Sequence, residues 1–350
     1  MTARGAARRV PAYDPRMRCL VITPDGLVPT ERPTPAPGHE QLLVRVHATA
    51  LNRADLMQIA GVYPAPPGWP ADVPGLEYAG EVVAVGPGVR ERAVGDRVFG
   101  LVGGGGLADH VVVHERTAVR VPDALSWTEA GAIPEVFMTA HDALVQAEAR
   151  PGELVLVHAV ASGVGLAAVQ LARAFGMQVV GTVRDSADAA RKLDAARALG
   201  LRDGVALGAE TLGDAKRLAE ALAALTGAPA RGADVVLDLV GGAYVGATCA
   251  AMAARGRMIL IGLVAGRRDT LDLGLILNRR LSLRGTVMRS RPLEERIATA
   301  ARFAREGVPL LADGRVRATI DATYPLEEAN AAYALLASNR TTGKIVLTVG

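Results

Sequence analysis

The sequence predicts an α/β fold in which a barrel-like β domain is joined to a doubly wound parallel sheet. Short apolar segments separated by Pro- and Gly-rich connections fill the first third of the chain, as in a small β barrel. After Pro122 the pattern changes, and short apolar strands alternate with Ala-rich helices. The chain has 350 residues, of which 50% are hydrophobic, so it is long enough for two domains with sizeable cores.

The first domain is expected over residues 17–125, with four clear strands at residues 17–22, 42–48, 81–85 and 110–114. The preceding tail, residues 1–16, carries four arginines but no apolar stretch, so it is not a secretory signal. We expect an unstructured extension there, and a transit peptide is the alternative.

The second domain is expected over residues 126–285. Ser126 and Glu129 have the spacing of a capping box at the start of a helix. Strands then alternate with helices, at residues 155–157, 178–183, 234–239 and 257–261. Two isolated strands near the end, at 319–324 and 344–348, predict that residues 286–350 cross back into the first domain.

One segment of the second domain reads as a strand, a turn of small residues and a helix: LVLVHAVASGVGLAAVQLARAFG, residues 154–176. Such a unit points backbone N–H groups and the positive end of a helix at one place, which suits a pyrophosphate. The pattern G-x-G-x-x-G is not met, because its three positions hold Val160, Ser162 and Gly165. A cofactor cradle and a plain packing device are both open on this motif alone. The βαβ run that follows favours the cradle.

Composition argues against several classes of function. The pI is about 9.1 but the net charge is only +3, and the scattered arginines show no aromatic interleaving, so nucleic-acid binding is not expected. Cys19 and Cys249 are too few for a disulfide framework or a zinc finger, which fits a reducing compartment. No apolar run approaches the ~18 residues of a membrane span. We therefore expect a cytoplasmic protein without nucleic-acid or membrane partners.

Four motifs occur in order along the chain: ALNRADLMQ (50–58), PGLEYAG (74–80), HAVASGVG (158–165) and TGKIVL (342–347). With them the chain, over about residues 17–349, resembles the zinc-independent quinone oxidoreductases of the medium-chain dehydrogenase/reductase superfamily. Within that family it is similar to the tumour-suppressor-inducible type. The resemblance implies a GroES-like β-barrel catalytic domain and a Rossmann domain.

The resemblance implies an active site around Asn52, Asp55 and Tyr63, with the first two beside a nicotinamide. For Asn52 and Asp55 the alternative is an N-cap of the helix that follows Leu51. Tyr63 lies in a Gly/Pro loop, where its phenol could stack on a flat substrate or donate to its oxygen. The alternative for Tyr63 is a surface aromatic. Met57 stands where many relatives have a second tyrosine, so one hydroxyl is missing.

Cofactor choice depends on the end of the second strand of the Rossmann domain. NAD-dependent folds place an acidic residue there, which binds the ribose hydroxyls. Here Val183 has that position and Arg184 follows, and a guanidinium suits a 2′-phosphate. Two residues argue against NADPH. Asp185 is an acid next to Arg184, and Gly208 stands where many relatives have a tyrosine. On balance NADPH is favoured.

Arg191 and Lys192 fall where relatives carry a phosphate-binding lysine, although a solvated helix face is the alternative. The resemblance implies further cofactor contacts at Thr139, Ser162, Gly163, Val164, Gly165, Gly262, Leu263 and Lys344. His158 ends a buried strand and is expected to be a core residue.

Three positions look like those of the catalytic zinc ligands of alcohol dehydrogenases, and here they hold Asn52, Leu76 and Glu135. Asn and Leu cannot supply the thiolate and imidazole that zinc prefers, so no metal is expected. Without a Lewis acid an unactivated ketone is a poor acceptor. A quinone or conjugated enone accepts hydride into a delocalised system and is a better one.

The sequence therefore predicts an NADPH-dependent quinone reductase, with the proton coming from solvent or Tyr63. One alternative is another oxidoreductase, an enoyl or 2-alkenal reductase. The other alternative belongs to a different functional class: a dinucleotide-binding protein with little turnover. A homodimer is also expected, because relatives pair their Rossmann sheets through a segment like 270–285. Residues 271–277 (LDLGLIL) would form an exposed apolar edge of that kind.

We predict that the purified protein carries no stoichiometric zinc and that chelators leave its activity unchanged, because Asn52 and Leu76 cannot ligate the metal. Elemental analysis checks the first point and assays with and without a chelator check the second. One bound zinc for every chain would overturn the expected chemistry.

Overall fold

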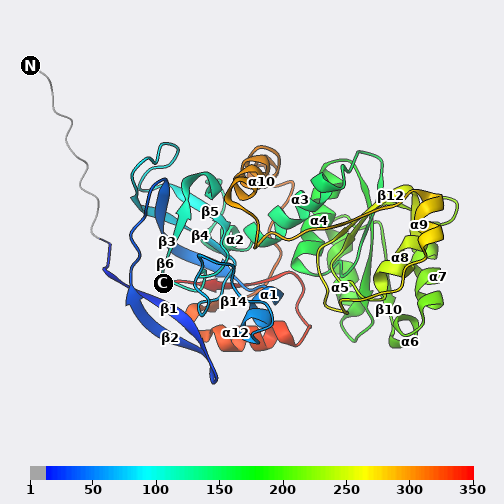
Figure 1. The fold of residues 1–350 in the computed structure, drawn as a ribbon, viewed down its shortest axis with the longest axis horizontal. Helices are drawn as coiled ribbons and strands as arrows, with labels where there is room; N and C mark the ends of the chain where they lie inside the picture. The colour runs from blue at the N-terminus through cyan, green and yellow to red at the C-terminus, as the bar shows by residue number, and fades with distance from the viewer. Residues whose placement is uncertain (1–12) are drawn as a thin grey trace, which may run out of the picture.

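The computed structural model describes residues 13–350, which form two halves, each built around its own sheet, that lie side by side in Figure 1. Of the predicted tail, residues 1–12 lie outside the described residues. The first strand already begins at Arg16.

The first half contains the elements β1 (Arg16–Thr23), β2 (Gly26–Pro33), β3 (Gln41–Ala50), α1 (Arg53–Ile59), β4 (Glu77–Val85), β5 (Arg97–Leu101), β6 (His110–His114), the 3-10 turn η1 (Glu115–Thr117) and β7 (Val119–Arg120). All four predicted strands are confirmed, and β3 and β4 are longer than their apolar patterns indicated. β3 pairs with both β4 and β6, so most of its side chains are buried and the alternation in its sequence is weak.

The second half contains α2 (Trp127–Gly131), the π-helical turn η2 (Pro134–Met138), α3 (Thr139–Gln146), β8 (Leu154–Val157), α4 (Gly163–Ala174), β9 (Gln178–Arg184), α5 (Ala189–Ala198), β10 (Asp203–Leu207), α6 (Ala209–Leu212), α7 (Ala215–Thr226), β11 (Ala233–Asp238), α8 (Tyr244–Ala251), β12 (Met252–Leu260), α9 (Leu273–Arg279) and β13 (Ser282–Gly285). The predicted capping box is confirmed. The Ser126 hydroxyl accepts from the Glu129 N–H at 3.2 Å, and the Glu129 carboxylate accepts from the Ser126 N–H at 2.9 Å.

Six parallel strands form the sheet of the second half, in the order β10-β9-β8-β11-β12-β13. The chain runs outward from β8 in one direction and from β11 in the other. The strand order therefore reverses between these two, and the crevice at their carboxyl ends is where such sheets bind ligands. The turn of small residues after β8 begins at this point. The predicted doubly wound sheet is confirmed.

The chain then returns to the first half through α10 (Leu293–Glu306), α11 (Val308–Ala312), β14 (Ile320–Pro325), η3 (Leu326–Glu328), α12 (Ala329–Ala337) and β15 (Lys344–Thr348). β15 pairs antiparallel with β3, opposing Val346 to Ala50, and β14 pairs with β15. The first sheet has the order β14-β15-β3-β4-β5-β7, with β6 on β3. The last strands thus join the first sheet, as predicted. The exact domain boundaries at 125 and 285 stay predictions.

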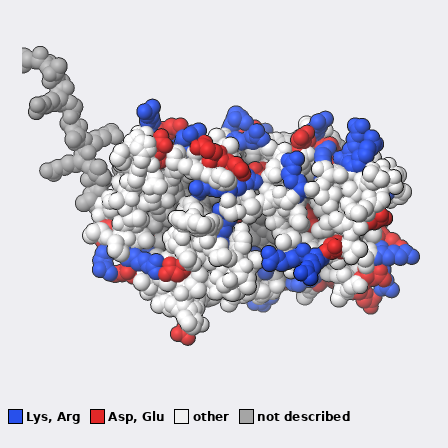
Figure 2. Space-filling model, in the orientation of Figure 1, with Lys and Arg blue, Asp and Glu red and all other residues white. Residues whose placement is uncertain are grey.

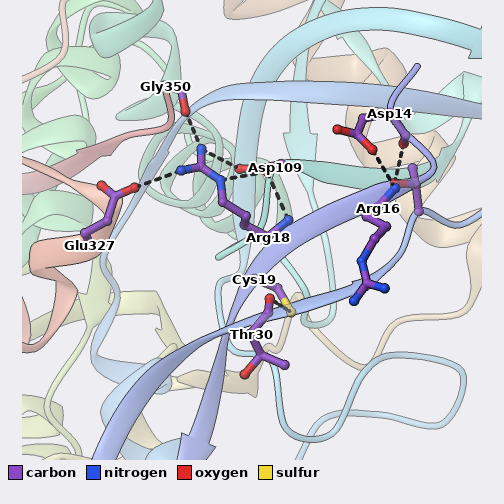
Figure 3. Close-up of polar contacts among 9 residues, drawn as sticks. Asp14, Arg16, Arg18, Cys19, Thr30, Asp109, Glu327 and Gly350 are labelled. Carbon is purple, nitrogen blue, oxygen red and sulfur yellow. Dashed lines mark hydrogen bonds and ion pairs between the residues drawn. The ribbon is translucent and has the colours of Figure 1, made fainter. Parts of the chain in front are cut away.

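Arg18 on β1 connects the hairpin β1–β2 to the rest of the first half (Figure 3). Its guanidinium contacts Asp109 at 3.2 Å, Glu327 at 3.2 Å and the carbonyl oxygen of Gly350. The ion pairs are partly exposed, so each contributes little on its own. Together they fix the hairpin against segments that are far apart in the sequence.

The predicted apolar edge at residues 271–277 is wrong. Most of this segment is in helix α9, and the edge strand of the sheet is β13 instead. Asp272 caps α9 by accepting from the Leu275 N–H at 3.1 Å, which commits the segment to a helix. Leu273 and Leu277 are 73% and 76% exposed on it. The oligomeric state stays a prediction.

Among residues 13–350 there is no helix with the length and hydropathy needed to cross a membrane.

Candidate active site

The turn after β8 allows a ligand to approach the backbone at the start of α4. Ser162 caps this helix, because its hydroxyl accepts from the Gly165 N–H at 3.1 Å. A Cβ on Gly165 would lie 2.5 Å from the carbonyl oxygen of Val160, and one on Gly181 would lie 2.6 Å from the Val160 Cβ. Both positions therefore require glycine. The exposed Ser162 and the first N–H groups of α4 form a place where an anion can bind.

Beside this turn the strand β15 approaches from the first half. The Gly343 N–H donates to the Ala161 carbonyl at 3.2 Å, and Gly343 pairs with Ser162. A Cβ on Gly163 would lie 2.8 Å from Val136 and 2.9 Å from the side chain of Lys344. The turn is therefore in direct contact with the residues that make up the buried cluster described below.

Four basic side chains are close enough for their charges to act on one another: Arg53 of α1, Arg184 at the end of β9, and Arg191 and Lys192 of α5. Burial lowers the pKa of Arg53, and the positive charge of Arg184 lowers it further. Burial also lowers the pKa of Lys192, as do the charges of Arg191, Arg184 and Arg53. Figure 2 shows blue residues gathered near the middle of this face, between the positions of α1 and α5 in Figure 1.

The segment 336–342 holds three of these cations. The Lys192 ammonium donates to the Asn339 carbonyl at 2.5 Å, and Arg53 donates to the Asn339 side chain. Arg191 donates to the Thr342 hydroxyl at 2.9 Å. Arg184 makes no hydrogen bond or ion pair with another described residue, so its guanidinium is available to a ligand.

A buried ion pair lies beneath the turn. Lys344 is 4% exposed and Glu77 is 0% exposed, and the ammonium donates to Glu77 Oε1 at 2.8 Å. It also donates to Asn52 Oδ1 at 2.7 Å and to the Leu51 carbonyl at 2.8 Å. These contacts use all three N–H donors of the lysine. The ammonium of Lys344 is thus fully occupied by other residues of the protein, and the cofactor contact expected at Lys344 stays a prediction.

Asn52 is the N-cap residue of α1, as in the alternative that the sequence left open, and the place of Asn52 and Asp55 beside a nicotinamide stays a prediction. The Asp55 carboxylate accepts from the Asn52 N–H at 2.8 Å, and the Asn52 amide donates to Glu77 Oε1 at 2.8 Å. Asp55 has no exposed surface. Burial raises its pKa to about 6, although the hydrogen bond from Asn52 and the charge of Lys344 oppose the shift.

Glu135 stands above this cluster on the π-helical turn η2. Its backbone N–H donates to Glu77 Oε2 at 2.8 Å, whereas its carboxyl makes no hydrogen bond to any described residue. Burial, and after it the negative charge of Glu77, raises the pKa of Glu135 to about 8. This raised pKa favours the protonated form of the carboxyl group.

A small cavity opens next to Glu135, at the junction of the two halves. It is lined by Leu76, Leu101, Val102, Gly103, Glu135, Met288, Arg289 and Arg296. Two of the three positions that resemble zinc-ligand positions, those of Leu76 and Glu135, thus line the same space.

Arg289 is the most buried cation of this cavity, with 8% of its surface exposed. It donates to the Gly103 carbonyl at 2.8 Å, to the Tyr63 carbonyl at 3.0 Å and to the Gln58 side chain. Its guanidinium lies 5.0 Å from the centre of the Tyr63 ring. Arg289 thus contacts both the backbone carbonyl and the ring of Tyr63 and holds this residue beside the cavity. Burial raises the pKa of the Tyr63 phenol.

The remaining predicted cofactor residues lie along the crevice. Thr139 begins α3, and its buried hydroxyl has no partner among residues 13–350. Gly262 and Leu263 follow β12, where a Cβ on Gly262 would lie 2.5 Å from the Leu239 carbonyl oxygen. Leu263 is 44% exposed. His158 is a core residue as predicted, hydrogen-bonded to Thr182 at 3.0 Å and to Thr248 at 2.9 Å.

Sequence reasoning assigned no site role to Glu77, Arg289 or Arg53, and considered Glu135 only as a zinc position. Glu77 was visible as an acid inside an apolar strand, which is a signal of a buried pair. Arg289 lies in an ordinary polar segment, and nothing in its neighbours marks it. Within the described part of the chain, no three His, Cys, Asp or Glu side chains are placed to hold a metal ion.

We predict that Lys344→Met destabilises the protein by about 3–5 kcal/mol, because it leaves the Glu77 carboxylate buried without its counter-ion. Chemical denaturation measures the loss. The double variant Lys344→Met/Glu77→Gln should recover part of it, since the uncompensated charge is then removed. Equal stability of the two variants would show that the charge is not the cause.

Two family models match the chain: the alcohol dehydrogenase GroES-like domain over residues 38–123 and the zinc-binding dehydrogenase domain over residues 207–347. The quinone oxidoreductase-like protein 2 homolog of Nematostella vectensis is 30% identical over 89% of this chain and 82% of that protein. The PikAII component of the pikromycin polyketide synthase of Streptomyces venezuelae is 35% identical over 98% of this chain. The chain spans only 8% of the length of that synthase.

Solved structures give the same result. An NAD-dependent alcohol dehydrogenase is 31% identical, with a TM-score of 0.79 over 95% of this chain and 100% of that chain. A mycobacterial protein solved as its NADPH complex is 27% identical, with a TM-score of 0.80 over 95% and 99%. The chain belongs to the medium-chain dehydrogenase/reductase superfamily of oxidoreductases, with a GroES-like domain and a dinucleotide-binding parallel-sheet domain.

Proposed function

We propose that this protein is an NADPH-dependent, zinc-independent reductase of quinones. The observation that carries the proposal is the cavity at the junction of the two halves. The guanidinium of Arg289 and the carboxyl of Glu135 both line it, together with Leu76, which stands at a position that resembles one of the zinc-ligand positions and cannot bind a metal. The similarity to a quinone oxidoreductase-like protein supports the same substrate class.

The described residues fit a dinucleotide. The turn 158–165 has the glycine and the helix N-terminus that close approach of a pyrophosphate requires. Arg184 has a free guanidinium for a 2′-phosphate, and the orphaned Thr139 hydroxyl lacks a partner that a ligand could supply. When bound, a reduced nicotinamide supplies hydride. The protein binds and orients the acceptor next to it and excludes water with the apolar side chains of the cavity.

An acceptor panel tests the proposed function. NADPH oxidation is followed with a simple quinone, a 2-alkenal, an enoyl thioester and an unactivated ketone. The quinone should be reduced fastest and the ketone not at all, because only conjugated acceptors delocalise the added charge without a Lewis acid. Binding of NADPH without oxidation by any acceptor would instead indicate a dinucleotide-binding protein with little turnover.

Reduction of an enoyl thioester is the second candidate. It is favoured by the similarity to polyketide synthases, one of which matches 98% of this chain at 35% identity. In the panel, this candidate requires the enoyl thioester to be turned over faster than the quinone.

We predict that Arg184→Ala weakens NADPH binding about 10- to 150-fold, because a charge-assisted hydrogen bond is worth roughly 1.5–3 kcal/mol. Affinity for NADH should be nearly unchanged, since NADH has no 2′-phosphate. Lys192→Ala should act in the same direction but less, because its ammonium is already bonded to Asn339. Titration of both cofactors measures the effect.

Arg202→Ala is the matched control, because Arg202 contacts Gln178 at the opposite end of β9. It should leave both affinities unchanged. Equal weakening of NADPH and NADH by Arg184→Ala would make Arg184 a structural residue, and a wild type that prefers NADH would overturn the cofactor assignment.

A further inference from the structure

The surroundings of Glu135 suit a general acid, that is, a carboxyl group that donates a proton to a bound molecule. Its carboxyl lines the cavity and makes no hydrogen bond within the described part of the chain. The charged groups that act on it are Glu77 of β4, Lys344 of β15, Asp55 of α1 and Arg289. Lys344 is already paired with Glu77 at 2.8 Å, so no ion pair holds Glu135 in its ionised form.

Arg289 has the surroundings of an electrophile. A guanidinium carries five N–H donors, and three of them bind the Gly103 carbonyl, the Tyr63 carbonyl and the Gln58 side chain. Two donors are left on a side chain that lines the cavity. All three acceptors are uncharged, and Arg289 makes no salt bridge with any residue in 13–350. An anion that forms in the cavity therefore does not have to displace a carboxylate from Arg289.

We propose that these two residues act together on the carbonyl oxygen of the acceptor: Arg289 donates hydrogen bonds to it as negative charge develops, and Glu135 protonates it. The inference rests on the proposed reduction of a conjugated carbonyl. It replaces solvent and Tyr63 as the expected source of the proton.

As hydride adds to the acceptor, the C–H bond that held it on the reduced nicotinamide would break and one new bond to the acceptor would form. An electron pair of the conjugated system then moves onto the carbonyl oxygen. The O–H bond of Glu135 breaks, and its proton forms the O–H bond of the product. The acceptor gains two electrons, the nicotinamide is oxidised, and the Glu135 carboxylate regains a proton from solvent.

Glu135→Gln is the first test. The carboxyl makes no hydrogen bond to any residue in 13–350, so the variant should fold normally. The expected loss in kcat is about 100-fold or more, the range of a missing general acid. In the wild type kcat should fall as the pH rises through about 8, because only protonated Glu135 is active. In Glu135→Gln this pH dependence should be absent. The matched control is Glu220→Gln, an exposed glutamate on α7.

The second test measures, without turnover, how strongly the cavity stabilises an oxyanion. 4-Nitrophenol is titrated in the presence of protein, and its phenolate absorbance reports how strongly the site favours an oxyanion. The wild type should lower the apparent pKa of the bound phenol, and Arg289→Gln should abolish the shift. Arg289→Lys keeps the charge and should restore part of it. Arg315→Gln, an exposed arginine paired with Asp313 at 2.7 Å, is the control.

The proton on Glu135 is read by infrared spectroscopy. A C=O band of a protonated carboxyl should be present in the wild type at neutral pH and missing in Glu135→Gln.

Failure of the proposed reductase function and failure of the roles given to Glu135 and Arg289 lead to different results. If the wild type reduces no acceptor, the proposed function fails, while the phenolate titration and the infrared band still test the site. If the wild type is active but Glu135→Gln keeps its kcat and its pH profile, Glu135 is not the proton donor. If the phenolate shift is the same in Arg289→Gln, Arg289 does not stabilise the oxyanion.

Discussion

The candidate site depends on the buried ion pair between Lys344 and Glu77. The two residues are 267 positions apart in the sequence, and their strands both flank β3. Taking two charges out of water is unfavourable, so the pair is tolerated only because further hydrogen bonds satisfy the remaining donors and acceptors. The Leu51 carbonyl, the side chain of Asn52 and the backbone N–H of Glu135 supply them.

The same pair determines the electrostatics of the cavity. Glu77 is ion-paired with Lys344 at 2.8 Å, and after burial the charge of Glu77 is the next largest cause that raises the pKa of Glu135, which lies outside the pair. The raised pKa of Glu135 favours its protonated form, whereas Arg289, which lines the same cavity, makes no salt bridge with any residue in 13–350. A protonated carboxyl and a cation in one small, mostly apolar space are suited to an acceptor that becomes an anion. Neither group could have this state if they were paired with each other.

Much of the fold could be predicted from the sequence because its signals are local. The Ser126–Glu129 capping box and the small residues around Gly165 depend on neighbours within a few positions, and both appear as expected. The segment 271–277 was misjudged because an apolar run of that length suits a strand or a helix equally. The side chain of Asp272, which caps α9, decided between them. In the site, the roles of Arg289 and Lys344 could not be predicted, because their partners are distant in sequence.

Most of the helices and strands, the place of the glycine turn and the family that the motifs resemble follow from the sequence alone, because periodicity, capping and turn chemistry are properties of short segments. The sequence also determined that Asn52 and Leu76 cannot ligate zinc, which follows from their side-chain chemistry alone. Only the tertiary structure decided which charges are paired and which are left free. That distinction depends on burial and on distances of a few ångströms between β4, β15, η2 and the segment before α10. It is these distances that separate Lys344, whose donors are all used, from Arg289, which has two to offer.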